Sequence, residues 1–185
     1  LPKLKGLYAE EQLRFTDVSY VRPRFDAVFL SHAHFDHVNH VQFLDPEIPV
    51  YLGVGTKLFL EAMEKTSSFC DYGEHRYRTF RTGDKIKIGN IVVEPVHVDH
   101  SIPAAYGFII RTSEGSVVYT GDLRMHGPRK DLTEDFLQRA RECEPTVLIC
   151  EGTRMVEREK RKNYSELQVE EKSNEVVSST DKMVF

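Results

Sequence analysis

A cluster of histidines and one carboxylate directly after an apolar run constrains this chain more than any other feature. The run Ala27–Leu30 has the length and composition of a buried strand and is too short for a helix. Three imidazoles and a carboxylate follow within a few residues, as His32, His34, Asp36 and His37. Packing alone does not explain a strand that ends in such a cluster, so the sequence predicts a metal site there.

The spacing of these side chains divides them into two groups. His32 and His34 are two residues apart, so both rings leave an extended segment on the same side. Asp36 and His37 are adjacent and point in different directions, so they can reach a second point nearby. Neutral imidazole and carboxylate suit zinc, manganese or iron, and no cysteine stands nearby as a structural zinc site would need. We therefore expect two divalent metal ions, Zn²⁺ first and Mn²⁺ as the alternative.

A histidine-rich surface loop or an affinity tag is the alternative interpretation of this cluster. A tag would be terminal and uniform, whereas this cluster is internal and contains a carboxylate. The metal interpretation is therefore preferred.

The composition is that of one soluble globular domain. The chain has 185 residues, of which 40% are apolar and 29% charged. No apolar run approaches the roughly 20 residues of a membrane span. Residues 1–5 lead into a Glu-rich stretch with no apolar core of a signal peptide, so we expect none. Cys70, Cys143 and Cys150 are odd in number and show no metal spacing, so we expect reduced thiols and a cytoplasmic protein. The net charge of −4 gives no overall attraction for nucleic acid.

Strand and helix patterns alternate along the chain, which predicts an α/β layered domain. The expected strands are 27–30, 49–52, 85–88, 91–98, 108–112, 117–120 and 145–150. The expected helices are 8–13, 38–44, 56–67, 131–143 and 165–179. Residues 68–84 are polar and turn-rich, and the charged run 155–163 is expected to be a solvated linker.

Several residues have expected local roles. Thr56 should cap its helix, whose apolar face would comprise Leu58, Phe59, Ala62 and Met63. Asp131 or Thr133 should cap the helix that follows. Ser165 and Gln168 have the spacing of a capping box. Cys150, in an apolar strand pattern, is expected in the core.

Three further polar residues stand where predicted strands end. They are His100, Asp122 and Glu151. The ion at His32 and His34 needs a third protein ligand, and His100 is preferred to His97 because a histidine inside a strand is more often a core residue or a partner of a ligand. A carboxylate able to bridge two ions is also needed, and Asp122 follows a glycine that leaves room for close approach.

Two other histidines are candidates for supporting roles. His40 lies one turn beyond the first motif and could orient a ligand by a hydrogen bond. His126 lies four residues past Asp122 and could line the pocket, while His97 is the candidate for a second-layer position.

The first motif, His32 to His37, matches the H-x-H-x-D-H signature of the metallo-β-lactamase superfamily. Three other stretches resemble the β-CASP nucleases of that superfamily, the group of ribonuclease J and the mRNA 3′-end cleavage factors. These stretches are Asp99–Pro103, Thr120–Arg124 and Pro145–Thr153, and the resemblance covers roughly residues 27–154. It departs from the usual motif at Gly152, where serine or a similar residue is more common.

The resemblance implies an αββα sandwich and a metal-dependent hydrolase. His32, His34 and His100 would hold one ion, Asp36 and His37 the other, and Asp122 would bridge them. The residues expected to take part in catalysis are Asp36, Asp122 and Glu151. In the family, the residue that Glu151 matches partners a histidine of the cap domain, which protonates the leaving oxygen.

The activity expected from these features is hydrolysis of phosphodiesters, with RNA as substrate and DNA as the alternative. A small-molecule hydrolase such as a thioesterase or lactonase is the rival enzyme. A non-catalytic scaffold subunit of an RNA-processing complex is a third hypothesis, although such subunits usually lose ligands and none expected in this span is missing. The sequence is also compatible with a homodimer.

Both ends of the chain look cut, so we expect an internal segment of a longer protein. Residues 1–153 would form the metallo-β-lactamase core without its N-terminal strands. Residues 154–185 would be a linker and the first helix of the β-CASP insertion. The last ligand of the second metal would then lie beyond Phe185.

Overall fold

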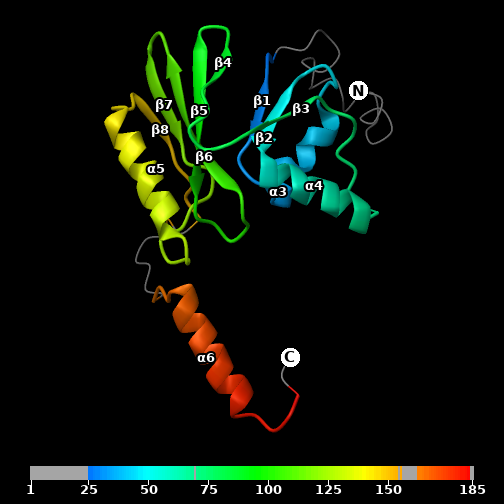
Figure 1. Ribbon diagram of the computed structural model, residues 1–185, viewed down its shortest axis with the longest axis vertical. Helices are drawn as coiled ribbons and strands as arrows, with labels where there is room; N and C mark the ends of the chain where they lie inside the picture. Colours follow the sequence, from blue (N-terminus) through cyan, green and yellow to red (C-terminus); the bar gives the residue numbers. More distant parts are fainter. Residues whose placement is uncertain (1–24, 69, 154, 156–161, 184–185) are drawn as a thin grey trace.

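The structure is a computed structural model that describes residues 25–68, 70–153, 155 and 162–183. The helix expected at 8–13, and most of the charged run 155–163, lie outside the described residues. Two β-sheets face each other, and helices cover their outer faces (Figure 1). This mixed α/β arrangement has the helix–sheet–sheet–helix layers that the sequence predicted.

The smaller sheet has three parallel strands in the order β1 (Val28–Leu30), β2 (Val50–Gly53) and β3 (Tyr77–Phe80). The first two strands were predicted, and β3 was missed. Its two middle residues, Arg78 and Thr79, are exposed, so the segment lacks an apolar run. Residues 77–80 form a strand because their backbone pairs with β2. The sequence pattern of residues 68–84 does not reveal this pairing.

The larger sheet has five strands in the order β4-β5-β6-β7-β8. Their bounds are β4 (Ile86–Ile88), β5 (Ile91–Val98), β6 (Ala105–Thr112), β7 (Gly115–Tyr119) and β8 (Val147–Ile149). Neighbours are antiparallel except β7 and β8, which are parallel. Strand β6 begins three residues earlier than expected, because it pairs with β5 as far as Ala105.

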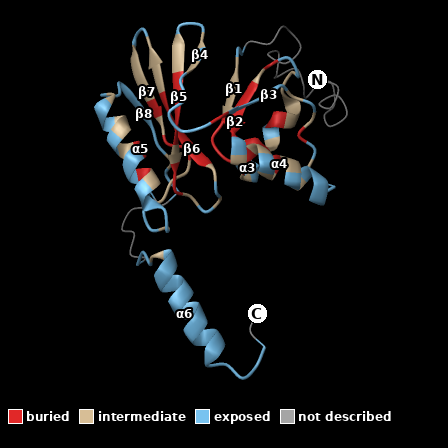
Figure 2. Cartoon of the chain, viewed as in Figure 1, coloured by how far each residue is buried: buried red, intermediate tan, exposed pale blue. Residues whose placement is uncertain are grey.

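Alternate side chains of each strand enter different cores, as the two-residue period of a strand requires. In β6, Ile109 packs with α5 (Lys130–Glu142), whereas Phe108 packs between the sheets. In β2, Leu52 packs on the helical side of the smaller sheet, whereas Tyr51 points between the sheets. Figure 2 shows the buried segments inside the sandwich and the exposed helix faces outside.

The helix after β2 differs from the prediction at its start. Helix α4 (Val54–Thr66) is capped by Gly53, and Thr56 lies inside its first turn. The hydroxyl of Thr56 donates a hydrogen bond to the carbonyl of Ala104, 2.9 Å away, instead of capping the helix. Leu58 is 60% exposed, so its assignment to the apolar face was wrong.

Helix α5 begins before either predicted cap, with Arg129 at the N-cap position. Thr133 is fully buried, and its hydroxyl accepts a hydrogen bond from the backbone N–H of Asp99. Asp131 lies in the first turn and pairs with Arg129 at 2.8 Å. The capping prediction was therefore wrong for both residues, because a long-range contact engages Thr133.

Strand β8 occupies the edge of the larger sheet and is exposed, contrary to the prediction of a buried strand. Leu148 is 61% exposed, and Cys150, directly after the strand, is exposed as well. No described helix covers this strand. The apolar sequence alone therefore misplaced Cys150 in the core.

Helix α6 (Glu166–Ser178) has the predicted capping box, in which Ser165 and Gln168 exchange hydrogen bonds. None of its residues is buried, and it projects from the sandwich (Figures 1 and 2). Its first residue touches the core, because the N–H of Glu166 donates to the carbonyl of His126 at 3.0 Å. Across the described residues, no helix is both long and apolar enough to cross a membrane.

Candidate metal centre

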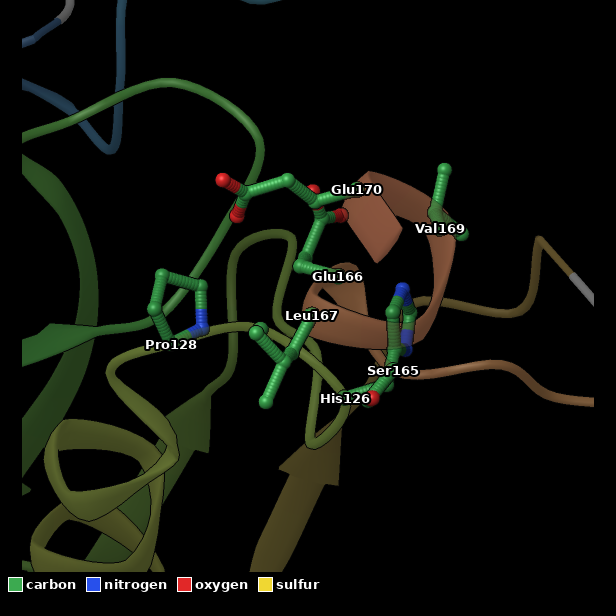
Figure 3. Close-up of a pocket in the computed structure, with 8 residues that line it drawn as sticks. His126, Pro128, Ser165, Glu166, Leu167, Val169 and Glu170 are labelled. Atoms are coloured by element: carbon green, nitrogen blue, oxygen red, sulfur yellow. The ribbon is translucent and has the colours of Figure 1, made fainter. Parts of the chain in front are cut away.

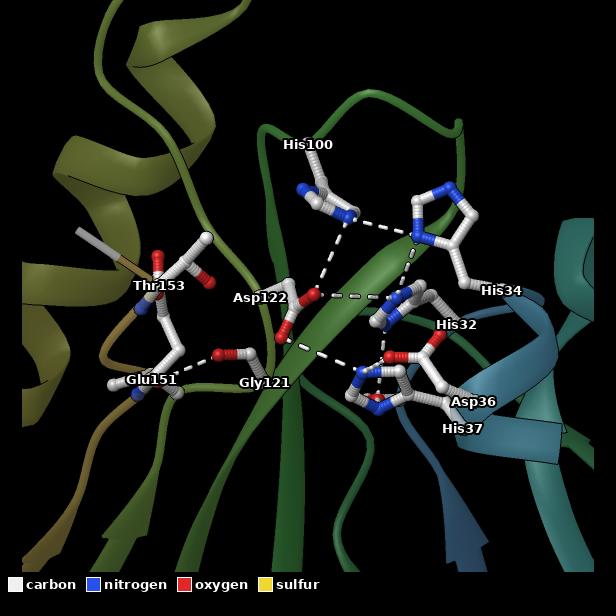
Figure 4. Close-up of polar contacts among 11 residues, drawn as sticks. His32, His34, Asp36, His37, His100, Gly121, Asp122, Glu151 and Thr153 are labelled. Atoms are coloured by element: carbon white, nitrogen blue, oxygen red, sulfur yellow. Dashed lines mark hydrogen bonds and ion pairs between the residues drawn. The ribbon is translucent and has the colours of Figure 1, made fainter. Parts of the chain in front are cut away.

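Three imidazoles converge at the ends of strands β1 and β5 (Figure 4). His34 Nδ1 lies 3.0 Å from His32 Nε2 and 3.0 Å from His100 Nε2. With zinc–nitrogen distances of 2.0–2.1 Å, the ligand nitrogens of a tetrahedral site lie about 3.3 Å apart. The three ring nitrogens are therefore close to the spacing that one such ion needs.

Asp122 lies three residues after the end of β7 and places its carboxylate against this group. Its Oδ2 lies 3.6 Å from His100 Nε2 and 3.8 Å from His32 Nε2. One ligand atom from each of His32, His34, His100 and Asp122 lies within 4.8 Å of the others. These residues were singled out in the sequence, and the fold brings them together from segments up to 90 positions apart.

His37 approaches the same carboxylate from the other side. Its Nε2 lies 3.5 Å from Asp122 Oδ1 and 3.6 Å from Asp36 Oδ2. The side chain of Asp36 is 80% exposed and is not a member of the four-residue group. Asp36 and His37 thus lie beside each other, and Asp122 connects His37 to the main group.

The local backbone explains how these side chains meet. Helix α3 (Phe35–Val38) begins inside the first motif, after His34 in an extended conformation, and the 3-10 helix η2 (Asn39–Phe43) continues it. The helix expected at 38–44 therefore starts earlier, and its first turn carries Asp36 and His37. Gly121 has φ +56°, and a Cβ there would press against the carbonyl of Tyr106, so glycine is required before Asp122.

Ser31 is a residue of this site that the sequence analysis did not single out. Its Oγ lies 3.1 Å from His32 Nδ1 and 3.5 Å from His37 Nδ1. Only its position directly before the first motif could have drawn attention to it. The hydroxyl contacts one imidazole from each of the two groups.

Burial favours the neutral form of two histidines of this group, His32 and His100. Burial is the largest cause and the neighbouring imidazoles of His37, His100 and His34 act in the same direction, so that together they lower the pKa of His32 to about 3. Burial also lowers the pKa of His100, although the carboxylate of Asp122 opposes this shift. A neutral imidazole offers a lone pair to a metal, so this electrostatic environment favours metal ligation.

A buried ion pair fixes the two loops that carry His100 and Asp122. Arg124 Nε lies 3.4 Å from Asp99 Oδ1, and the N–H of Arg124 donates to the carbonyl of Asp99 at 2.8 Å. The Thr133 hydroxyl completes a ring, since it accepts from the N–H of Asp99 and donates to the carbonyl of Arg124. These contacts hold the loops that carry His100 and Asp122 next to each other, and no sequence pattern predicted them.

A pocket of about 620 Å³ opens beside the metal-ligand candidates. His100 and Asp122 lie in its wall together with Glu151 and His126. Glu151 turns its carboxylate back on its own loop, where Oε2 accepts from the N–H of Thr153 at 2.8 Å (Figure 4). His126 lies in the same wall, and a role for it in the pocket stays a prediction.

The other two supporting histidines do not join the group. His97 lies within β5 and stacks on Tyr106, with ring centroids 4.9 Å apart. Burial is the main cause that lowers the pKa of His97, and the positive charge of Arg129 lowers it as well. His40 is exposed and contacts the edge of Phe43, so its expected hydrogen bond to a ligand is absent from the described contacts.

A second cavity, of about 460 Å³, lies between the loop after Asp122 and the start of α6 (Figure 3). His126 and Pro128 form one wall, and Leu167 and Glu170 belong to the other. The metal-ligand candidates do not line it. This cavity is therefore a feature of the α6 junction and lies apart from the candidate metal centre.

Sequence comparison identifies the family to which this fold and ligand group belong. Residues 7–175 match the family model of the beta-lactamase superfamily domain. The chain is 33% identical over 165 residues to ribonuclease J of Sinorhizobium meliloti, an alignment that covers 82% of this chain and 27% of that protein. It is 31% identical over 143 residues to ribonuclease J of Pyrococcus abyssi, covering 72% and 31%. The chain thus spans less than a third of the length of these relatives.

Solved structures support the same placement. A protein of unknown function from Enterococcus faecalis V583 aligns with a TM-score of 0.68 and 32% identity, over 81% of this chain and 38% of that one. An N-acyl homoserine lactone hydrolase aligns with a TM-score of 0.51 and 16% identity, over 72% and 58%, and this likeness shows the fold alone. The chain therefore belongs to the metallo-β-lactamase superfamily, and within it to the β-CASP group of the ribonuclease J type.

Proposed function

We propose that this chain forms the metal-binding core of a two-metal phosphodiesterase that cleaves RNA in the cytoplasm. The family and the His/Asp group support a metal-dependent hydrolase, and the ribonuclease J relatives suggest the substrate. Its three cysteines are free thiols, in keeping with a reducing compartment. DNA is the alternative substrate.

The position of the Asp122 carboxylate carries the two-metal proposal. Its Oδ2 faces His32 and His100, and its Oδ1 faces His37. A carboxylate with one oxygen toward each group of imidazoles has the arrangement of a bridging ligand. The donors are imidazole nitrogens and carboxylate oxygens, which suit zinc or manganese.

In this proposal different residues bind the two ions. His32, His34 and His100 would hold one ion, His37 and Asp36 the other, and Asp122 both. A pair of divalent ions about 3.5–4 Å apart supplies a nucleophile from water and stabilises charge on the attacked phosphate. Asp36 Oδ2 already lies 3.6 Å from His37 Nε2, so the two side chains could share an ion although that of Asp36 is 80% exposed.

Glu151 is proposed to act in proton transfer at the leaving oxygen, with a partner outside this chain. It lies in the wall of the same pocket as His100 and Asp122, which supports the proposal. Its carboxylate is engaged with the Thr153 N–H, so this contact would have to open when a partner arrives.

The test uses the full-length protein that contains this chain and a 5′-labelled single-stranded RNA. With added zinc or manganese, the wild type should cleave the RNA, and Asp122→Ala should lose at least 10²-fold, because the variant lacks the shared ligand. Glu47→Gln serves as a control, since this exposed residue pairs only with Arg76 among the described residues. Elemental analysis should find zinc, manganese or iron in the wild type purified without chelator.

Other outcomes would contradict the proposal. Hydrolysis of a thioester or lactone with no cleavage of RNA or DNA would assign the protein to the small-molecule hydrolases. Absence of bound metal and of every hydrolytic activity would favour a scaffold subunit.

A further inference from the structure

Ser31 lies directly after β1, and its Oγ is within 3.5 Å of one imidazole from each of the two groups. We propose that its hydroxyl positions His32 and His37 for metal binding by accepting a hydrogen bond from Nδ1–H of each ring. Ser31 would thus be a positioning residue shared by the two metal subsites. This inference rests on the proposed metal-binding function.

The atoms that face one another support this assignment. His32 and His37 both turn Nε2 toward Asp122, at 3.8 and 3.5 Å, and both turn Nδ1 toward Ser31. A neutral imidazole carries one proton, so a ring that offers the Nε2 lone pair to a metal has its proton on Nδ1. A serine oxygen has two acceptor lone pairs and can therefore receive both N–H groups.

The backbone of Ser31 is fixed, so the hydroxyl has little freedom to leave this position. The residue is 4% exposed, and its carbonyl accepts a hydrogen bond from the N–H of Tyr106 at 3.0 Å. A Cβ added at Gly121 would lie 3.2 Å from the Cβ of Ser31, which shows how closely the loop before Asp122 packs on it. The end of β1, strand β6 and the Asp122 loop therefore enclose the serine from three directions.

The Oγ atom of Ser31 contacts both metal subsites. His32 belongs to the group with His34 and His100, whereas His37 belongs to the pair with Asp36. Loss of the hydroxyl would leave two buried or half-buried N–H groups without an acceptor, and either ring could then flip or change tautomer. Both metal subsites should weaken together, which distinguishes Ser31 from a partner of a single ligand.

The experiment compares Ser31→Ala, Ser31→Thr and a control in the full-length protein. Affinity for Zn²⁺ is measured by competition with a chromophoric chelator, and site geometry by the visible spectrum of the Co²⁺-substituted protein. Ser31→Ala should bind each of two zinc ions 10- to 100-fold more weakly, the usual loss for a partner of a metal ligand. Ser31→Thr, which keeps a hydroxyl, should restore most of the affinity. Thr112→Val should match the wild type, because it removes a hydroxyl bonded to Gly115 in the β6–β7 hairpin.

A second measurement needs neither metal nor activity. In the metal-free protein, ¹⁵N NMR of the imidazoles should show Nδ1–H on His32 and His37, and Ser31→Ala should lower the population of that tautomer. Wild-type rings with the proton on Nε2 would overturn the proposal even if Ser31→Ala failed to fold. So would a folded Ser31→Ala with zinc affinities equal to those of Thr112→Val. Failure of RNA cleavage with intact zinc binding would contradict the proposed function and leave this inference standing.

Discussion

The guanidinium of Arg124 lies 2.7 Å from the carboxylate of Glu166, and this ion pair joins the loop after Asp122 to the first turn of α6. The same guanidinium lies 3.4 Å from Asp99, the neighbour of His100. Arg124 therefore connects the loop that carries His100, through Asp99, with helix α6, through Glu166. Because no residue of α6 is buried, this pair and the backbone contact at His126 are central to how α6 is held.

Glu166→Gln should loosen α6 without unfolding the sandwich. The Glu166 side chain is half-exposed, so the pair is worth up to about 1 kcal/mol, a factor of about five in an equilibrium. Amide hydrogen exchange in α6 should accelerate by up to about fivefold, while β5 and β6 stay unchanged. Glu170→Gln, one turn further along the same helix, is the matched control. Equal exchange in the two variants would show that the pair does not hold the helix.

The metal-free protein should lose stability as the pH falls from 6.5 toward 3. Burial lowers the pKa of His32 to about 3, whereas the unfolded residue titrates near 6.5. Between these values the unfolded state binds more protons than the folded state. The free energy of unfolding therefore decreases as the pH decreases, by up to about 1.4 kcal/mol per pH unit for one group. Burial lowers the pKa of His97 too, which adds to the same trend.

Chemical unfolding at several pH values in the presence of a chelator measures this dependence. His32→Asn should flatten it, and His40→Asn, at an exposed histidine, should leave it intact. A wild-type slope no steeper than that of His32→Asn would refute the assignment of the effect to His32.

Cys150 should be the most reactive thiol of the 185-residue chain. It is exposed, whereas Cys70 and Cys143 are half-buried, and burial raises the pKa of the Cys143 thiol. A thiol-specific chromogenic reagent should modify one cysteine rapidly, and Cys150→Ser should abolish this fast phase. The substitution should change the free energy of unfolding by less than about 0.5 kcal/mol, as at other surface sites. A fast phase that survives in Cys150→Ser would contradict the exposed position of this residue.

Gly127→Ala should destabilise the protein by about 1–3 kcal/mol, the usual cost of inserting a methyl group into a filled space. A Cβ at this position would collide with Asp99 Oδ2 and Arg124 Nε, the two partners of the buried pair. Thermal unfolding measures the loss. Gly152→Ala is the control, because its Cβ would meet only Met155, at an ordinary 3.5 Å. Equal stability of the two variants would show that the Asp99–Arg124 pair has room to move.

Much of the strand framework and the candidate ligands could be predicted from sequence because they depend on neighbouring residues. Apolar runs locate β1, β2, β5 and β7, and each candidate ligand follows a strand. The capping box at Ser165 and Gln168 is likewise a contact between residues three apart, and the structure contains it. Spacing also separated His32 and His34 from Asp36 and His37. Their roles as metal ligands, and the division of the chain at residue 153, remain predictions.

Features that depend on distant residues were missed or wrong. Strand β3 forms by pairing with β2, and Thr56 bonds to Ala104, 48 positions away, instead of capping its helix. Thr133 likewise accepts a hydrogen bond from the N–H of Asp99, 34 positions away, and does not cap its helix. Cys150 has an apolar sequence context but lies after an uncovered edge strand. For β3, Thr56 and Thr133 the partner lies far away in sequence, and for Cys150 the apolar sequence context does not reveal that nothing described covers the strand before it.

The sequence by itself determined which residue types stand at the strand ends, and hence the chemistry that the site can support. The tertiary structure decided how those residues face one another. Asp122 turns one oxygen to His32 and His100 and the other to His37 because the two sheets pack with their strand ends side by side. The distance of 3.8 Å between the side chains of His32 and Asp122, 90 positions apart, depends on that packing, and local backbone preferences carry no information about it.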